Sequence, residues 1–257
     1  MADLRVEAAD GVATVTLDRP DALNSLTVPL KVELISLFSD LARDRQVRAV
    51  ILTGAGRAFC AGQDLRERLD PSAEPLDVEL RDRYNPLVRA IRDLPRPVVA
   101  AVNGVAAGAG ASLAFACDLR LAADTARFVL AFGQIGLIPD SGATWTLQRL
   151  VGLSKATEIA LLPDPLSAAD AERFGLVTRV VPAEDLMVEA VALAARLAAL
   201  SPTAVALTKR ALAAAATSTF EDALELEARL QGEAGANPDH AEGIAAFIEK
   251  RPPRFGG

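Results

Sequence analysis

The sequence of 257 residues has few of the side chains on which several common active sites depend. It contains one histidine, His240, and two cysteines, Cys60 and Cys117. These counts exclude metal sites built from two or more histidines, four-cysteine metal sites and a disulfide framework, so we expect no metal site. A Ser-His-Asp mechanism would have to use His240, which stands in a polar segment and is more simply explained as a surface residue near the start of a helix.

Aromatic residues and net positive charge are also scarce. Phe, Trp and Tyr make up 4% of the chain, and 27 Lys and Arg against 34 Asp and Glu give a net charge of −7. This balance disfavours binding to nucleic acid, although it permits a local basic site for one phosphorylated ligand. Residues 1–7 lack the basic end and long apolar stretch of a signal peptide, so we expect a cytoplasmic protein.

Charge is absent from residues 97–117, and about 20 apolar residues are enough to cross a bilayer. However, Asn103 and Gly104 interrupt the run. Residues 97–102 are rich in Val, which is typical of a strand buried on both faces, and residues 108–117 are small and apolar like a buried helix. We therefore predict a strand, a glycine turn and a core helix here.

The periodicity of the remaining chain predicts an α/β region over residues 1–182 and an all-helical region after it. The charged segment 66–82 contains two prolines and is expected to be a mobile surface segment. Strands are predicted at 4–8, 12–17, 47–52, 97–102, 119–122 and 177–181, and helices after Thr27 and at 84–93, 108–117, 141–151, 155–162, 167–175, 184–200, 203–216, 220–231 and 239–249.

Two glycine-containing turns, residues 57–65 and 104–110, each follow a strand. The G-x-x-x-G-x-G spacing of the second turn does not match the dinucleotide-binding fingerprint, and no Walker lysine follows it. Small residues let a backbone approach a ligand closely, and a helix N-terminus offers free N–H donors. Tight packing of helix against strand is the alternative explanation. Two such turns can direct two N–H groups to one point, which is an oxyanion hole in outline.

Five motifs in this order resemble those of the crotonase superfamily, also called the enoyl-CoA hydratase/isomerase family. The resemblance covers essentially the whole chain, and its strength lies in the five motifs occurring together. The motifs are RPDALNSL at residues 19–26, FCAGQDL at 59–65, AVNGVAAGAG at 101–110, IPDSG at 138–142 and FIEKR at 247–251.

The resemblance implies a fold and a substrate. The fold is of the α/β class, a crotonase-like (ClpP/crotonase) spiral of ββα units over residues 1–195. A helical C-terminal oligomerisation region, residues 196–257, follows it and packs between the subunits of a homotrimer or a dimer of trimers. The substrate is an acyl-CoA thioester, with coenzyme A as part of the substrate and no other bound cofactor.

The resemblance also implies the catalytic groups. The backbone N–H groups of Gln63 and Ala109 match the two donors that hold the thioester oxygen, and Asp140 matches the catalytic Asp of the isomerase and dehalogenase branches. The two glutamates of hydratases correspond to Ser112 and Phe132 in this sequence. Because neither residue can move a proton at neutral pH, we expect an isomerase rather than an ordinary hydratase.

The segment around Asp140 is most similar to the ring-epoxide isomerases of phenylacetate degradation, which turn 1,2-epoxyphenylacetyl-CoA into its oxepin and can shift a 3-ene to a 2-ene acyl-CoA. The position of the dehalogenase His holds Asn85 here. The residues expected to bind substrate or coenzyme A are Ala22, Leu23, Ala61, Asp64, Leu65, Arg66, Gly108, Phe132, Phe247 and Lys250, of which Phe247 and Lys250 would act at the adenine end from a neighbouring subunit.

Three alternatives stay open. Asp140 without the resemblance is a good N-cap for the helix that follows it. The chain as a whole can be an enoyl-CoA hydratase that acts weakly without the usual glutamates. It can also be a catalytically silent acyl-CoA-binding homologue, and a carboxylate at residue 140 argues against that interpretation.

Overall fold

The computed structural model describes residues 3–256 of the chain and has two sheets at its centre. The larger sheet has the strand order β1-β2-β3-β5-β7-β10, in which only the β1–β2 pair is antiparallel. Its strands are β1 (Leu4–Ala9), β2 (Val12–Leu17), β3 (Ala49–Gly54), β5 (Val98–Val102), β7 (Leu119–Ala123) and β10 (Arg179–Val181). The smaller sheet contains β4 (Ala58–Cys60), β6 (Val105–Ala107), β8 (Arg127–Val129) and β9 (Leu166–Ser167).

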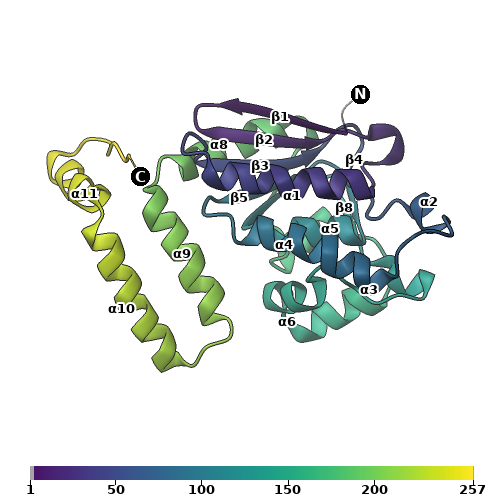
Figure 1. Ribbon diagram of the computed structural model, residues 1–257. Coiled ribbons are helices and arrows are strands. Elements are labelled where there is room, and N and C mark those ends of the chain that lie inside the picture. The colour runs from purple at the N-terminus through teal and green to yellow at the C-terminus, as the bar shows by residue number, and fades with distance from the viewer. Residues whose placement is uncertain (1–2, 257) are drawn as a thin grey trace.

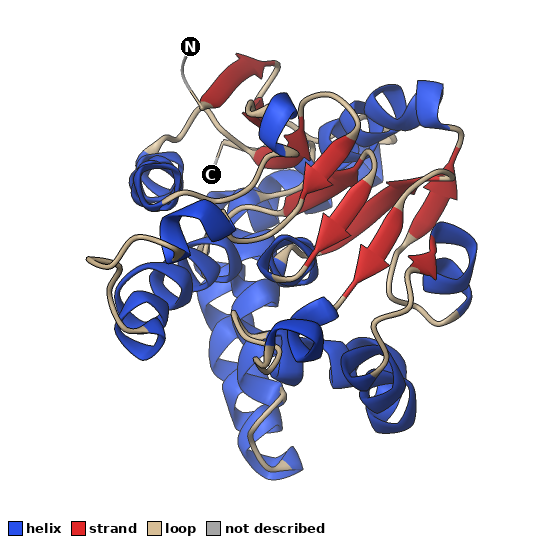
Figure 2. Cartoon of the chain, turned by 90° about the vertical axis from the view of Figure 1, so that its right-hand side faces the viewer, coloured by secondary structure: helices blue, strands red, loops and turns tan. Residues whose placement is uncertain are grey.

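Helices cover the sheets, as Figures 1 and 2 show. Every residue of β3 and β5 is buried, which explains why these strands are continuous apolar runs. Helix α1 begins where the Thr27 side chain accepts a hydrogen bond from the N–H of Leu30, and a proline stands in its first turn. The helices of this region are α1 (Val28–Arg43), α4 (Asn85–Arg92), α5 (Ala109–Ala116), α6 (Ala143–Leu161), α7 (Ala168–Arg173) and α8 (Leu186–Ala198).

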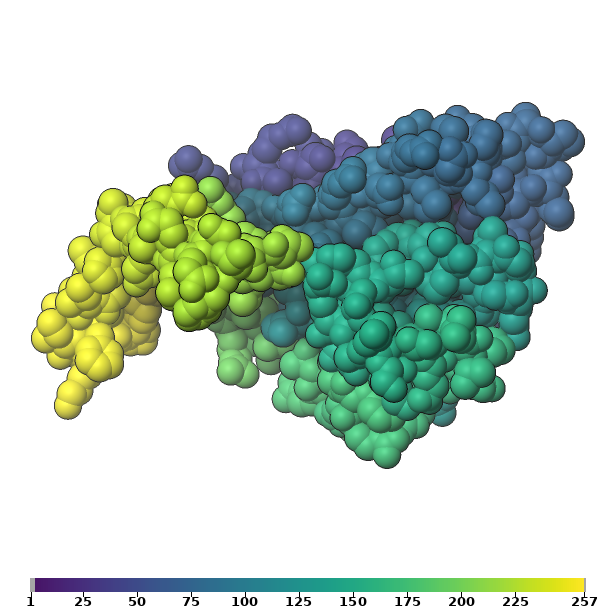
Figure 3. All heavy atoms as spheres, turned by 90° about the horizontal axis from the view of Figure 1, so that it is seen from below, coloured from purple at the N-terminus to yellow at the C-terminus, as the bar shows by residue number. Residues whose placement is uncertain are grey.

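The last three helices form an arm that stands away from the sheets (Figures 1 and 3). They are α9 (Pro202–Ala215), α10 (Phe220–Ala236) and α11 (Pro238–Glu249). Helix α8 packs on the larger sheet through Leu186, Ala190 and Ala194, and the chain then bends by 100° into α9. Helix α8 therefore belongs with the sheets, and the arm begins with α9.

Large apolar side chains are exposed on the arm. They include Leu212, Phe220, Leu224, Phe247 and Ile248. No single helix among residues 3–256 has the length and composition to cross a membrane, and the bent pair 183–198 and 202–215 meets that test only when both helices are joined.

The structure confirms the strand, turn and helix predicted for residues 97–117, and differs from the sequence predictions in three places. The helices predicted at 141–151 and 155–162 form the single element α6, which has a kink at Gly152. The smaller sheet was not predicted, because its strands have only two or three residues and show no periodicity. The segment expected to be a mobile surface stretch contains two short helices, α2 (Leu65–Arg68) and α3 (Leu76–Glu79), and a π-helical turn at Leu80–Tyr84. The side chain of Glu79 in this segment is buried, so the expectation of a wholly surface segment was wrong.

Candidate active site

The two glycine turns meet backbone to backbone. Strands β4 and β6 pair in parallel, so the turns that follow them lie side by side. A Cβ added at Gly62 would lie 2.8 Å from the carbonyl oxygen of Ala107 and 3.3 Å from the nitrogen of Ala109. A Cβ added at Gly110 would lie 2.2 Å from the carbonyl oxygen of Cys60. This close approach requires glycine at both positions.

Each turn presents one free backbone N–H to the same space. Gln63 forms an isolated parallel bridge with Leu26, and that bridge uses the carbonyl of Gly62 and the N–H of Asp64. The N–H of Gln63 itself consequently points to the opposite side. Ala109 is the first residue of α5, so its N–H has no partner within the helix. Neither N–H donates a hydrogen bond within residues 3–256.

A cavity of about 390 Å³ lies in front of these two donors. Its walls are largely apolar, and Asp140 is the one carboxylate among its described lining residues. The lining consists of Ala61, Gly62, Gln63, Leu65, Arg68, Leu76, Tyr84, Ala107, Gly108, Ala109, Ala131, Phe132, Gln134, Ile135, Leu137 and Asp140.

Asp140 is partly buried in this wall, and its oxygen Oδ1 accepts a hydrogen bond of 2.9 Å from the Ser141 hydroxyl. Desolvation raises the pKa of the Asp140 carboxyl, and the negative charge of Glu79 raises it further. The hydrogen bond from Ser141 and the positive charge of Lys31 lower this pKa. The net result is a pKa above the ordinary value. Such a carboxyl is suited to taking up and returning a proton.

The carboxylate of Asp140 does not cap the helix that follows. The N-cap of α6 is Gly142, which provides no side-chain hydrogen bond. Only the backbone carbonyl of Asp140 takes part in the turn, by accepting from the N–H of Ala143 at 2.9 Å. The N-cap interpretation of this side chain is therefore wrong.

The two positions that hold glutamates in the resembled hydratases carry no acid here. Ser112 is buried, and its hydroxyl lies 3.2 Å from the carbonyl oxygen of Gly108 and 3.1 Å from that of Asp140. Phe132, in the 3-10 helix Ala131–Ile135, lines the cavity with its ring. Among its described lining residues the cavity thus has two N–H groups without a partner and one carboxylate.

The expected binding residues near the first turn divide into two groups. Ala61, Leu65, Gly108 and Phe132 line the cavity, and the carbonyl of Leu23 accepts a hydrogen bond of 2.9 Å from the N–H of Ala61. Ala22, Asp64 and Arg66 do not line it.

The role of Asp64 is visible in its contacts. Its carboxylate accepts hydrogen bonds from Arg19 and Ser25 and from the N–H of Arg66, at 3.2–3.3 Å. These bonds cap α2 and hold the turn, so the Asp64 carboxylate is bonded to groups of the chain itself.

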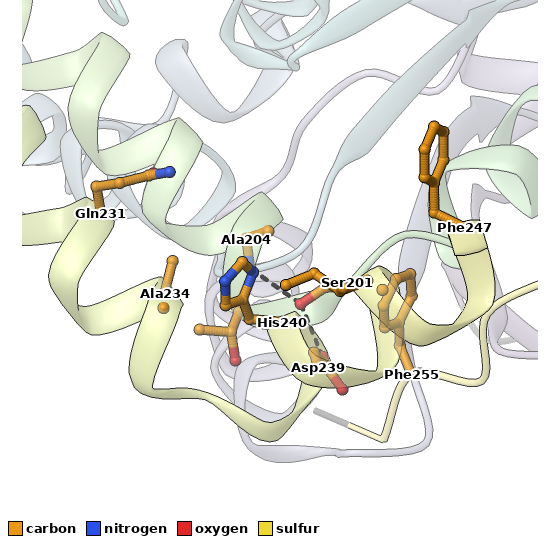
Figure 4. A pocket seen from close by; sticks show the side chains of 12 residues that line it. Ser201, Ala204, Gln231, Ala234, Asp239, His240, Phe247 and Phe255 are labelled. Carbon is orange, nitrogen blue, oxygen red and sulfur yellow. Dashed lines mark hydrogen bonds between the residues drawn. The ribbon is translucent and has the colours of Figure 1, made fainter.

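Phe247 and Lys250 lie at the end of α11 and do not line this cavity. Phe247 is 86% exposed and borders a second cavity of about 590 Å³, enclosed by the helices of the arm (Figure 4). The expected role of these two residues at the adenine end of a coenzyme A held by a neighbouring subunit stays a prediction.

His240 also borders the second cavity, near Ser201 and Asp239 (Figure 4). The Ser201 hydroxyl donates to Asp239 Oδ2 at 2.7 Å and accepts from the N–H of Ala204, so it caps α9. In a Ser-His-Asp triad the serine hydroxyl must instead donate its hydrogen bond to the histidine imidazole, which takes the proton. These residues consequently fix the end of the arm, and His240 is exposed near the start of α11 as predicted.

One set of polar residues behind the cavity was not predicted. Lys31 is completely buried and forms an ion pair with the buried Glu79, which also contacts Gln63 and Arg68. The sequence contained a weak signal that Lys31 is buried. Lys31 lies three positions before Leu34 and seven before Phe38, which places it on the apolar face of α1.

The chain is similar to known proteins over almost its whole length. The sequence profile described as enoyl-CoA hydratase/isomerase matches residues 7–257. The chain is 47% identical to a protein of Rhodobacter capsulatus named probable enoyl-CoA hydratase, over 99% of this chain and 98% of that protein. It is 46% identical to the 1,2-epoxyphenylacetyl-CoA isomerase of Escherichia coli, over 96% of this chain and 95% of that protein.

Solved structures show the same fold. The enoyl-CoA hydratase of Bacillus anthracis superposes with a TM-score of 0.96 at 35% identity, and the match covers 100% of both chains. An enoyl-CoA hydratase from Polaromonas sp. JS666 superposes with a TM-score of 0.93 at 33% identity, covering 98% of this chain and 99% of that one.

Proposed function

Because the chain belongs to the enoyl-CoA hydratase/isomerase family, we propose that it is an acyl-CoA isomerase that shifts a double bond or opens a ring epoxide through a thioester enolate. The observation that carries this proposal is the pairing of two free N–H donors with a single carboxylate, Asp140, in one cavity. Coenzyme A is part of the substrate in this proposal, and no other cofactor takes part.

The two donors stabilise the charge that develops on the thioester oxygen. When a proton leaves C2 of the acyl group, its electron pair moves to the carbonyl oxygen, which becomes an enolate oxygen between the N–H groups of Gln63 and Ala109. Both groups are backbone atoms held by the contact between the two turns, so they need no reorganisation during the reaction. Removing one such donor costs about 3 kcal/mol of transition-state stabilisation.

Asp140 provides the single base that an isomerisation requires. Its carboxylate takes the proton from C2 of a 3-enoyl thioester and returns it to C4, while the double bond moves to C2–C3. For a ring epoxide that becomes an oxepin, the C–C bond shared by the epoxide and the ring breaks while the oxygen keeps its bonds to both carbons. Asp140 takes the C2 proton to give the enolate and returns that proton to a ring carbon, so the mass is unchanged. The raised pKa of Asp140 favours both transfers, because it lies closer to the working pH than that of an ordinary carboxyl.

Adding water requires a different set of groups. One group must activate the water and another must protonate carbon, and the hydratase positions hold Ser112 and Phe132. The name of the relative from Rhodobacter capsulatus nevertheless keeps weak hydratase activity as a second candidate function. A silent acyl-CoA-binding protein is a poorer candidate, because nothing in binding explains a partly desolvated carboxylate that caps no helix.

We further propose that the chain works as a homotrimer or a dimer of trimers. The exposed apolar residues of the arm support this, since a face of that kind is normally covered by another protein surface. Phe247 and Lys250 then close the adenine end of a coenzyme A bound by the neighbouring subunit.

Incubation with four thioesters tests the proposed activity. They are a 3-enoyl-CoA, 1,2-epoxyphenylacetyl-CoA, crotonyl-CoA and a saturated acyl-CoA. Mass spectrometry and ultraviolet absorbance then identify the products. We expect conversion of the first, the second or both without a change in mass, and little gain of water by crotonyl-CoA. Rapid hydration of crotonyl-CoA would make the chain a hydratase, and conversion of none of them would support a binding protein.

A further inference from the structure

The ion pair between Lys31 and Glu79 lies directly behind the cavity wall. The side chains of Lys31 and Glu79 are 0% and 3% exposed, so both charges have left water almost completely. Burying two charges costs about as much as their attraction returns, so a pair of this kind is weak evidence for a contribution to stability. Its position next to Gln63 suggests a role at the site.

Glu79 connects this pair to one of the two donor residues. One of its carboxylate oxygens accepts from Lys31, and the other accepts from Gln63 Nε2 at 3.0 Å and from Arg68 Nη1 at 3.0 Å. The bridge to Leu26 holds the backbone on either side of Gln63. The residue is thus fixed through its side chain and through its flanking peptides.

We propose that Glu79, itself held by Lys31, is a positioning residue that keeps the backbone N–H of Gln63 directed at the thioester oxygen. This inference rests on the proposed function, because it assigns a task in the same oxyanion hole. Neither charged residue touches the substrate in this assignment. Both act through Gln63.

The need for such a support follows from the chain around the donor. The N–H of Gln63 belongs to the peptide that it shares with Gly62, and Gly62 has a φ of +91°. Glycine has a wide conformational range, so rotation of this peptide meets little resistance from Gly62 itself. An oxyanion donor is effective only if its direction is set before the reaction. Anchoring the Gln63 side chain restricts that rotation.

The two charges have opposite effects on the proposed base. Glu79 raises the pKa of Asp140 and Lys31 lowers it. Lys31 lies 4.4 Å from the centre of the Tyr84 ring, and Tyr84 lines the cavity with Asp140. A charged acceptor for Gln63 without Lys31 would raise the pKa of Asp140 further, because the opposing effect of Lys31 would be lost.

Two double variants isolate the contact with Gln63. Lys31→Met/Glu79→Gln and Lys31→Met/Glu79→Leu both remove both charges, so they have the same electrostatic effect on Asp140. They differ in whether residue 79 offers an oxygen to Gln63 Nε2. We expect the first variant to keep a kcat about tenfold or more above that of the second, with the KM of both changed less than about twofold from the wild type.

The single variant Gln63→Leu removes the other end of the same hydrogen bond and leaves the ion pair in place. We expect the same loss of kcat, and no additional loss when it is combined with Lys31→Met/Glu79→Leu, because both changes break one connection. Circular dichroism and thermal unfolding establish that each variant is folded.

A measurement without turnover completes the test. Acetoacetyl-CoA has an ultraviolet band in its enolate form, and a well-directed oxyanion hole increases the bound enolate fraction. We expect that fraction to fall in Gln63→Leu and in Lys31→Met/Glu79→Leu, and to persist in Lys31→Met/Glu79→Gln. Equal behaviour of the two double variants, or an unchanged enolate fraction in Gln63→Leu, would overturn the inference. Wild-type protein that converts no thioester but shows the expected enolate pattern would contradict only the proposed function.

Discussion

The hydroxyl of Ser112 lies 3.1 Å from the backbone carbonyl oxygen of Asp140, so helix α5 is tied to the loop that carries Asp140. Ser112 belongs to α5, whose first residue is Ala109. A position that bears an acid in the resembled hydratases therefore connects the proposed donor Ala109 with the proposed base.

Ser112→Ala should lower kcat about fivefold with little change in KM. One buried hydrogen bond is worth about 1 kcal/mol, and the loop of Asp140 loses its anchor to α5 without it. Steady-state kinetics with a 3-enoyl-CoA measures the effect. Thr146→Ala is the matched control, because its hydroxyl also donates to a backbone carbonyl, that of Gly142, but away from the cavity. An equal loss of kcat in both variants would show that Ser112 acts only through stability.

Asp140→Asn should lower kcat by about 10²-fold or more while the protein stays folded. The amide keeps the shape of the side chain but cannot accept the C2 proton, and no helix cap is lost. Kinetics on the substrate that the wild type converts best measures the loss. Retention of near-normal isomerisation would exclude Asp140 as the base.

The same substitution should raise the stability at neutral pH or leave it unchanged. The pKa of Asp140 is raised by folding, so its favourable contribution is fully present below the unfolded pKa and is lost as the pH rises through the folded pKa. Asparagine has no such loss. Thermal unfolding at pH 7 and pH 3 checks this, and we expect the advantage of the variant to disappear at pH 3, where the wild-type carboxyl is protonated in both states.

The pH dependence of kcat should report the same carboxyl. Asp140 must be ionised to take a proton, so activity should fall as the pH is lowered through a pKa above the ordinary 3.8. A pH–rate profile with a 3-enoyl-CoA shows this directly, because the acyl group of that substrate does not titrate. An acid limb centred at 3.8 or lower would contradict the desolvation of this side chain.

Ala109→Pro should reduce kcat by about 10²- to 10³-fold, since it deletes one oxyanion donor. Proline is tolerated at the first position of a helix, where its missing N–H has no helical partner in any case, so the variant should fold. Ala109→Gly keeps the N–H and should remain within about threefold of the wild type. If Ala109→Pro remained fully active, the second donor would have to be a different group.

The sequence predicted the fold better than it predicted the side-chain contacts behind the cavity. Strands β3 and β5 and helix α1 can be predicted from the pattern of apolar residues alone. The two strands are continuous apolar runs because both faces are buried, and α1 has apolar residues at helical spacing because one face is buried. The turn at residues 104–110 is recognisable because close backbone contact leaves glycine as the only residue that fits.

The undetected features depend on contacts that are distant in the chain. Lys31 and Glu79 are 48 positions apart, and nothing local to either residue identifies the other as its partner. The smaller sheet is built from strands too short to show a period. The sequence allowed two interpretations of Asp140, a helix cap and a base. The cap is excluded only by the backbone geometry, because Gly142 holds the N-cap position of α6.

The arm offers a prediction about assembly. Light scattering at micromolar concentration should give a trimer or a larger multiple, because the exposed apolar residues of α9–α11 need a covering surface. Lys250→Ala should then weaken acyl-CoA binding without lowering kcat at saturation, as measured by KM and by calorimetric titration. Glu249→Ala, one residue earlier on the same helix, serves as the control. A monomer in solution, or unchanged affinity in Lys250→Ala, would reject the contribution of a neighbouring subunit.

The two proposed oxyanion donors are main-chain atoms, and this has a consequence for how the protein can change. Side-chain replacement at residue 63 or 109 cannot delete an amide hydrogen unless the new residue is proline, whereas the side chains at 112, 132 and 140, the positions where the resembled enzymes carry their acids and bases, are each one substitution from another identity. In the proposed mechanism, the stabilisation of an enolate therefore depends on the backbone fold, whereas the product depends on a few side chains that can be replaced. A lineage can move from one acyl-CoA reaction to another without passing through an ancestor that has lost its electrophilic centre.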